Sequence, residues 1–358
     1  MDTNTAVSEG IAPLLNPFLL TYTMVMSLML LSLLRYANNR PAAAFQAAPI
    51  LLKRLGLPVP SFSSSSLFSA SSVSAVPHSL PSFANETLTP AGTRMPACVH
   101  RILTRDEAKE RVLVVGDVHG CLEELQALLV KANYTAAKDS VVLVGDLVNK
   151  GPLSAETVKW CRTQGFYSVR GNHDDSALAA YFRVGKFTGV SSLPQAYDFV
   201  AALDEADVAW LDSLPYTLSI EHLGVVVVHA GLLPGRPLQM QQAADMSRIR
   251  SVKRAEEGGE GTWVGVEYIP ENGEAEPWAK VWSQEGKECE GGEGSTDARH
   301  LLFGHDAKRG LQVFRKATGL DTGCCYGREL TLAILPGEER ISVKALKAYQ
   351  VPHGLKSD

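Results

Sequence analysis

Six side chains that could bind metal ions lie in five short segments of the chain, and each segment follows an apolar run. They are carboxylates, one amide and imidazoles: Asp117, His119, Asp146, Asn172, His229 and His305. Oxygen and imidazole donors of this kind suit divalent ions such as zinc, manganese, iron or cobalt. Two such ions about 3.5–4 Å apart hold both the attacking and the leaving oxygen of a phosphoryl transfer. The set therefore predicts a site for two divalent metal ions, with Asp146 as the carboxylate that they share.

Each segment by itself is a weak signal. A Gly-Asp or Asn-His pair after a strand is usually turn chemistry, and a lone histidine is more often structural than a metal ligand. We give that structural interpretation to the histidines at positions 78, 100, 222, 300 and 353. Five segments in one ordered series are far more specific than any one motif.

Three of the segments end strand-like runs. Strands are expected at residues 111–115, 141–144 and 166–169, followed by helices at 122–132, 155–161 and 176–182. Ser154 is expected to cap the second helix. Strands that alternate with helices form a parallel sheet, and such sheets carry their sites at the C-terminal ends of the strands. The ligand segments should therefore meet at one sheet edge.

The remaining apolar runs predict a second sheet. A helical stretch is expected at 197–214, and strands at 216–220 and 225–228. Further short strands, expected to pair antiparallel, lie at 301–303, 311–314, 330–335 and 341–346. The predicted fold class is α/β (α+β), with the second sheet packed on the first.

The series Gly-Asp-Val-His-Gly, Gly-Asp-Leu-Val-Asn-Lys-Gly, Gly-Asn-His-Asp, His-Ala-Gly and Gly-His-Asp resembles the calcineurin-like metallophosphoesterases of the phosphoprotein phosphatase superfamily, over about residues 112–346. The resemblance implies a four-layer fold of two packed mixed sheets flanked by helices. It also implies the ligands of each metal: Asp117, His119 and Asp146 for one, and Asp146, Asn172, His229 and His305 for the other. It makes His173 the general acid for the leaving oxygen, and lets Arg170 help to position phosphate.

Two departures from the protein phosphatases of this superfamily concern the second and third motifs. Asn149-Lys150 stands where those enzymes have Asp-Arg, and Asp174 where they have Glu. Asn149 can still hydrogen-bond the catalytic histidine, but Lys150 cannot reproduce the bidentate contact of arginine. Both changes resemble the bacterial diadenosine-tetraphosphatase-like branch, as do residues 304–312 and 320–327. That branch includes the zinc-dependent endopolyphosphatase of fungal vacuoles, and this resemblance favours zinc.

The expected function is hydrolysis of phosphoanhydride bonds, with inorganic polyphosphate as the preferred substrate. Diadenosine tetraphosphate is the alternative substrate for this reaction. The second hypothesis is a phosphatase for phosphoserine or phosphothreonine in proteins, and the third is an inactive adaptor. Basic residues beside the ligand segments are candidates for binding a polyanionic phosphate substrate: Lys150, Arg248, Arg250 and Lys308. The alternative for each is a solvated surface position. Asp321 is either a partner of a ligand histidine or a turn residue.

Composition fits a globular domain, with 45% hydrophobic and 20% charged residues. The net charge of −5 gives no reason to expect specific nucleic-acid binding. The six cysteines contain no CxxC pair and indicate free thiols. Four regions are predicted: a membrane anchor at 1–36, a Ser/Pro-rich disordered linker at 37–99, the catalytic domain at 100–350 with an exposed acidic insertion at about 255–297, and a tail at 351–358.

The stretch at about 11–34 carries no charged residue and is long enough to span a membrane. A cleaved signal peptide is the alternative. Arginine and lysine residues follow the stretch and none precedes it, which predicts a cytosol-facing domain. The sequons at Asn85 and Asn133 favour a lumenal one instead. By resemblance, we expect a vacuolar membrane protein with a lumenal catalytic domain.

Overall fold

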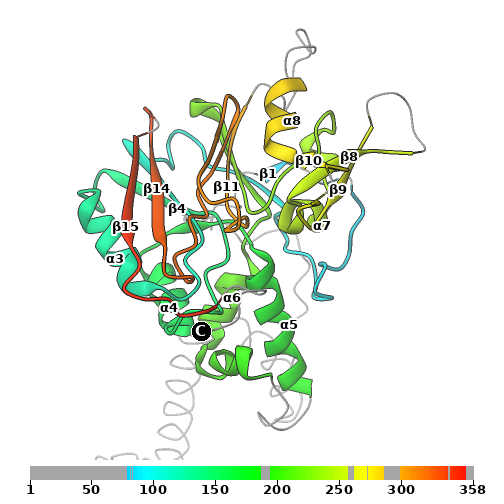
Figure 1. The fold of residues 1–358 in the computed structure, drawn as a ribbon. Helices are drawn as coiled ribbons and strands as arrows, with labels where there is room; N and C mark the ends of the chain where they lie inside the picture. The colour runs from blue at the N-terminus through cyan, green and yellow to red at the C-terminus, as the bar shows by residue number, and fades with distance from the viewer. Residues whose placement is uncertain are drawn as a thin grey trace, which may run out of the picture. The chain divides into compact units, whose positions relative to one another are not determined.

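Two β-sheets pack face to face in the part of the chain that the structure, a computed structural model, describes (Figure 1). The described residues are 79–80, 82, 84–186, 194–256, 262–271, 273–285, 299–337 and 339–351. The first sheet has the order β15-β14-β3-β4-β5. Its strands are Arg111–Val115 (β3), Asp139–Leu143 (β4), Tyr167–Ser168 (β5), Glu329–Leu335 (β14) and Glu339–Lys344 (β15).

The second sheet has seven strands in an order that mixes early and late parts of the chain. In spatial order they are Ser79–Leu80 (β1), His100–Ile102 (β2), Thr217–Ile220 (β6), Val225–Val228 (β7), His300–Phe303 (β11), Ala317–Gly319 (β13) and Gln312–Phe314 (β12). Both strands predicted at 216–220 and 225–228 are present as β6 and β7, and they pair antiparallel. β11 pairs parallel with both β7 and β13, so the antiparallel pairing expected for it was wrong. More than seventy residues separate β7 from β11, which leaves room for the crossover that a parallel pair needs.

Alternate residues of β3 enter two different cores. Val112 and Val114 pack between the two sheets, whereas Leu113 and Val115 face the helices that cover the first sheet. Side chains along a strand point to opposite faces. A strand covered on both faces therefore appears as the unbroken apolar run that precedes Asp117. β3, β4 and β5 are parallel, as predicted.

Helices cover the outer face of the first sheet. They are Leu122–Lys131 (α3), Ser154–Thr163 (α4), Asn172–Lys186 (α5) and Glu205–Asp212 (α6), with the 3₁₀ helix Gln195–Ala202 (η2). Ser154 is the first residue of α4 rather than its cap, and its hydroxyl accepts the backbone N–H of Asn149. The stretch expected at 197–214 is divided between η2 and α6, because Asp204 and Asp207 form a capping box that starts a new helix.

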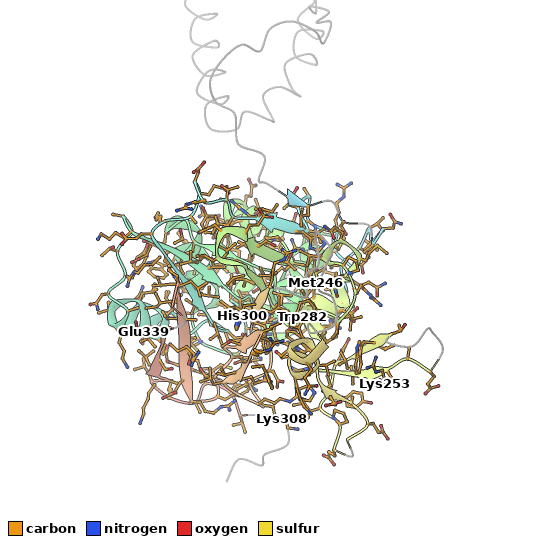
Figure 2. All side chains as sticks on the ribbon, turned by 90° about the horizontal axis from the view of Figure 1, so that it is seen from above. Met246, Lys253, Trp282, His300, Lys308 and Glu339 are labelled. Atoms are coloured by element: carbon orange, nitrogen blue, oxygen red, sulfur yellow. The ribbon has the colours of Figure 1, made fainter. Side chains whose placement is uncertain are left out.

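The outer face of the second sheet packs on Ala243–Arg248 (α7), Trp278–Glu285 (α8) and a small sheet of Ser251–Arg254 (β8), Trp263–Val266 (β9) and Glu276–Pro277 (β10). Of these, β9, β10 and α8 lie within the predicted exposed acidic insertion at about 255–297. Trp278 and Trp282 are buried there, and Figure 2 shows Trp282 beside Met246 while Lys253 stands at the margin. The insertion is thus partly core, because its apolar residues have a sheet face to cover. With these layers, the predicted four-layer arrangement is confirmed.

The predicted linker at 37–99 contains an ordered part. Residues 84–99 pack against the domain: Thr93 donates to Asp175, and the backbone N–H of Ala243 donates to Glu86. The boundary of the folded unit therefore lies before residue 100, since these polar contacts fix the segment although it contributes few apolar side chains.

The predicted membrane span at 11–34 lies outside the described residues, as does most of the tail at 351–358. Among the described residues, none of the helices is both long and apolar enough to cross a bilayer.

Candidate metal centre

The six predicted ligands lie at the C-terminal ends of strands from both sheets. Asp117 and His119 follow β3, Asp146 follows β4, and Asn172 opens α5 just after β5. His229 follows β7 and His305 follows β11 in the second sheet. The metal-binding ends of the two sheets meet, so segments far apart in the sequence deliver their side chains to one place.

Three ligands have left-handed backbone conformations that non-glycine residues rarely adopt. The φ angles are 47° at His119, 51° at Asp146 and 67° at His305. Such strain costs of order 1–3 kcal/mol per residue and persists only where the surroundings enforce it. It indicates a functional site at which the backbone turns sharply to present each side chain.

Glycines let the ligand loops approach one another closely. A Cβ atom on Gly304 would lie 2.0 Å from Asp117 Oδ1, and one on Gly171 would lie 2.2 Å from Asp146 Oδ1. Neither position can carry a larger residue without moving a candidate ligand. The Gly-His-Asp and Gly-Asn-His-Asp motifs therefore begin with glycine for a steric reason.

Asp146 stands between two groups of ligands. Its Oδ2 lies 3.5 Å from His119 Nε2, which in turn lies 4.0 Å from Asp117 Oδ2. Its Oδ1 lies 3.4 Å from His229 Nε2, in the group that also contains His305. Each carboxylate oxygen thus faces a different group, as expected of the residue that two metal ions share.

The second group presents lone pairs to a common point. His229 Nδ1 is 2.9 Å from the Val144 carbonyl oxygen, and His305 Nε2 is 2.9 Å from that of Arg248. A carbonyl oxygen only accepts, so these ring nitrogens carry the protons. The other nitrogens then face Asn172 Oδ1 with lone pairs, His229 Nε2 at 3.0 Å and His305 Nδ1 at 3.1 Å. Three acceptors can converge this closely around a cation, so the donor set fits a metal ion.

Electrostatics at the site also favour cation binding. Burial lowers the pKa values of His119, His229 and His305, which keeps these rings neutral, the form that binds metal. Burial by itself would raise the pKa of Asp146, but the surrounding imidazoles, His229 first among them, and the Lys150 ammonium hold that pKa below its usual range. Burial raises the pKa of Asp117 well above its usual range. A divalent cation would offset this cost by stabilising the ionised carboxylate.

Asp174 connects the second and third motifs. Its carboxylate is fully buried and accepts the backbone N–H groups of Asp146, Leu147 and Gly171, each at 2.9 Å. Burial raises its pKa to about 8, and the three N–H bonds oppose that rise. The residue therefore holds the backbones of Asp146 and Gly171 in place and supports the ligand loops without binding metal.

His173 faces the first group of ligands. One of its ring nitrogens lies within 4.8 Å of the ligand atoms of His119 and Asp146. Asn149 Nδ2 donates to His173 Nδ1 at 3.2 Å, which leaves Nε2–H free to donate to a substrate oxygen. Asn149 therefore orients the histidine as predicted. Burial lowers the pKa of His173 to about 4.

Lys150 brings a positive charge to the first group. Its Nζ lies 2.8 Å from His119 Nε2 and over the Tyr326 ring, 5.4 Å from the ring centroid. Burial lowers its pKa, but Asp146 and other neighbours raise it more, so the pKa of Lys150 is raised overall. Tyr326 was not predicted as a site residue, and only its position in the fold identifies it.

Arg170 does not face the site, contrary to the prediction. Its side chain is fully buried, and its guanidinium pairs with Asp175 at 3.5 Å and donates to the carbonyls of Leu211 and Asp212. The adjacent Gly171 belongs to the ligand loop. The Arg170 side chain, however, points away from the ligands, toward the helices and the Tyr216 ring.

The remaining basic candidates differ in their positions. The Arg250 side chain contacts a ligand residue, since its Nη2 donates to the His305 backbone carbonyl at 3.1 Å. Arg248 contributes its carbonyl oxygen to His305, while Lys308 is exposed (Figure 2). Arg309, the next residue after Lys308, donates to the Arg250 carbonyl at 2.9 Å and to Asp306 at 2.5 Å.

Asp321 is the turn residue of the two roles considered for it. Its Oδ1 accepts the backbone N–H of Gly323 at 3.0 Å. Burial raises its pKa to about 6, and its charge contributes to the raised pKa of Asp117.

Comparison with known proteins identifies this arrangement. The sequence profile of the calcineurin-like phosphoesterase family matches residues 110–309, more than half of the chain. The chain belongs to this family. Calcineurin-like phosphoesterases are hydrolases with a dinuclear divalent metal centre, and the six ligands described above are the residues that would hold it. Two such ions, when bound, supply an activated water and withdraw charge from the phosphate.

Relatives of this calcineurin-like phosphoesterase include symmetrical bis(5'-nucleosyl)-tetraphosphatases of Yersinia pestis (strain Pestoides F) and Yersinia pseudotuberculosis (strain IP 31758). Each is 27% identical over 284 residues, which cover 66% of this chain and 92% of the relative. A crystal structure described as a candidate diadenosine tetraphosphatase is 32% identical in sequence, with a TM-score of 0.56. The match covers 68% of this chain and 97% of the chain in that structure. The predicted resemblance to the diadenosine-tetraphosphatase-like branch is confirmed.

Proposed function

We propose that this phosphoesterase cleaves the phosphoanhydride bonds of a dinucleoside tetraphosphate, with inorganic polyphosphate as the second candidate. The observation that carries the proposal is the position of Lys150 beside the metal ligand His119, in a centre that also presents His173. The named activity of the bis(5'-nucleosyl)-tetraphosphatase relatives supports the first substrate. The resemblance to the fungal endopolyphosphatase supports the second.

The chain's own residues divide the work of the reaction. Lys150 belongs to the second motif, and Arg250 lies in the segment after the His-Ala-Gly motif. These two cations would neutralise the phosphates on either side of the scissile bond. Asn149 keeps the His173 ring oriented so that its Nε2–H can donate to the leaving oxygen. Asp146 and Asp174 hold the two metal-binding loops in register.

Lys150 also disfavours the hydrolysis of phosphoserine or phosphothreonine in proteins. A lysine ammonium is a point charge, whereas the arginine of protein phosphatases grips two phosphate oxygens in a fixed plane. We therefore expect weak turnover of a phosphopeptide. Zinc is the proposed metal, again by resemblance, with manganese, cobalt and iron as alternatives.

The test uses the full-length protein, stripped of metal and restored separately with zinc, cobalt, manganese or magnesium. Diadenosine tetraphosphate, long-chain polyphosphate and a phosphopeptide are compared at equal phosphate concentration, with Asp146→Asn as the inactive control. Cleavage of the dinucleotide that disappears in the control supports the first candidate. Polymer shortening without dinucleotide cleavage supports the second. A clear preference for the phosphopeptide would overturn both.

A further inference from the structure

A cavity of about 410 Å³ lies beside the catalytic loop of the second motif. Asn149, Lys150 and Ser154 form one wall. Gln195 and Phe199 from η2 and Gln350 from the C-terminal segment form the others. Its volume is within the range of small-molecule sites in proteins.

The cavity adjoins the reaction centre through shared residues. Two of its lining residues contact residues of the centre directly: Lys150 Nζ is 2.8 Å from His119, and Asn149 Nδ2 is 3.2 Å from His173. A substrate whose phosphates reach the metal ligands and Lys150 can therefore extend its next chemical group into this cavity.

The lining does not suit further phosphates. Lys150 is the only charged side chain among its nine lining residues, and it already serves the reaction centre. Phosphates carried into the cavity would lack partners, since phosphate recognition relies on lysine, arginine or clustered N–H groups. The walls formed by Gln195, Phe199 and Gln350 offer an aromatic ring and two side-chain amides.

The lining does suit a nucleobase. Phe199 is a half-buried ring that packs on the helical core, so its position is set in advance. Gln195 and Gln350 are exposed, and their side-chain amides can both donate and accept. Bases are recognised by stacking on an aromatic ring and by hydrogen bonds to their edges. Backbone contacts fix the rim, because the N–H groups of Tyr349 and Gln350 both donate to the Cys325 carbonyl.

We propose that this cavity binds a nucleobase of the substrate, with Phe199 as the stacking platform and Gln195 and Gln350 as edge contacts. The proposal rests on the proposed function and narrows its substrate class from phosphate chains in general to nucleotides. It predicts that the protein distinguishes a phosphate chain that carries a nucleoside from one that does not.

The experiment measures kcat/KM of the full-length, metal-loaded protein for diadenosine tetraphosphate and for linear inorganic tetraphosphate. Phe199→Ala is expected to lower the ratio of the two values about tenfold, through KM, because one stacking contact is lost. Phe199→Trp should restore most of the ratio, and Gln350→Ala, at an exposed position, should lower it less. Phe182→Ala is the matched control, since Phe182 is 40% exposed on α5 and does not line the cavity.

The outcomes distinguish failure of the base site from failure of the proposed function. A ratio that stays constant in Phe199→Ala, or a parallel fall for both substrates, overturns the base site. Cleavage of inorganic tetraphosphate but not of the dinucleotide overturns it too, while leaving the hydrolase activity established. If the wild type cleaves neither, the proposed function fails by itself, and calorimetric titration with adenosine monophosphate then decides. Binding that is about tenfold weaker in Phe199→Ala supports the base site, and equal or absent binding overturns it.

Discussion

Among the residues that the structure describes, Asp146 is the side chain shared by both ligand groups. Asp146→Asn replaces one of its oxygens by an N–H₂ group, which cannot bind a cation. We expect kcat to fall by about 10²- to 10³-fold or more and the metal content, measured by mass spectrometry of the purified protein, to fall below that of the wild type. Asp245→Asn, at an aspartate paired with Arg236 outside the site, should retain both. Full metal content in Asp146→Asn would show that the two ions do not share this residue.

Arg170 is a structural residue although it adjoins a ligand loop. Arg170→Met leaves Asp175 buried without its cation, so we expect the free energy of unfolding to fall by about 3–5 kcal/mol in urea titrations. KM for the substrate should not change in the protein that remains folded. Arg162→Met, at a pair whose arginine is 25% exposed, should cost less. A raised KM in Arg170→Met at unchanged stability would show that Arg170 contributes to substrate binding.

Loops at the strand ends position the ligands through close contacts between backbones. Gly304, just after β11, approaches Asp117 so closely that Gly304→Ala must displace the carboxylate. We expect activity to fall about 10- to 100-fold, with weaker metal binding measured by competition with a chelator. Gly165→Ala is the control: it has a φ of 68° with nothing within 4 Å, and costs only about 1–2 kcal/mol of strain. Normal metal affinity in Gly304→Ala would show that the loop relaxes without moving Asp117.

At the scale of the whole molecule, the membrane anchor predicted at residues 11–34 can be tested separately from catalysis. Leu28→Arg with Leu31→Arg places two charges in the predicted span, each costing about 2.5–3.5 kcal/mol at a helix centre. We expect the full chain to remain in the membrane pellet after alkaline carbonate washing and this double variant to be released. The same substitutions at Leu57 and Leu67, in the predicted linker, should have no effect. Release of the unaltered chain would exclude the anchor.

The orientation of that anchor can be read from glycosylation. Asn85 and Asn133 are both exposed, so either can be modified if the domain is lumenal. A mass shift on endoglycosidase treatment that is lost in Asn85→Gln with Asn133→Gln would support the lumenal side. An unmodified protein would favour the cytosol-facing alternative.

The sequence by itself determined the candidate ligand set and the strands that carry it. Each ligand lies within a few residues of a buried strand, and short motifs of this kind specify their own turns through glycine and the strand pattern. Asp117, Asp146 and His305 could be found for that reason. The resemblance to the phosphatase superfamily also indicated the contact between Asn149 and His173.

Only the tertiary structure decided where long side chains point and which distant segments meet. Arg170 turns into the core because Asp175 and Tyr216 lie there, and nothing near Arg170 in the sequence reveals this. The pairing of β11, the docking of residues 84–99 and the buried tryptophans of α8 all depend on surfaces formed by other parts of the chain. The cavity beside Lys150 depends on η2 and Gln350, which are far apart in the sequence and are brought together by packing alone.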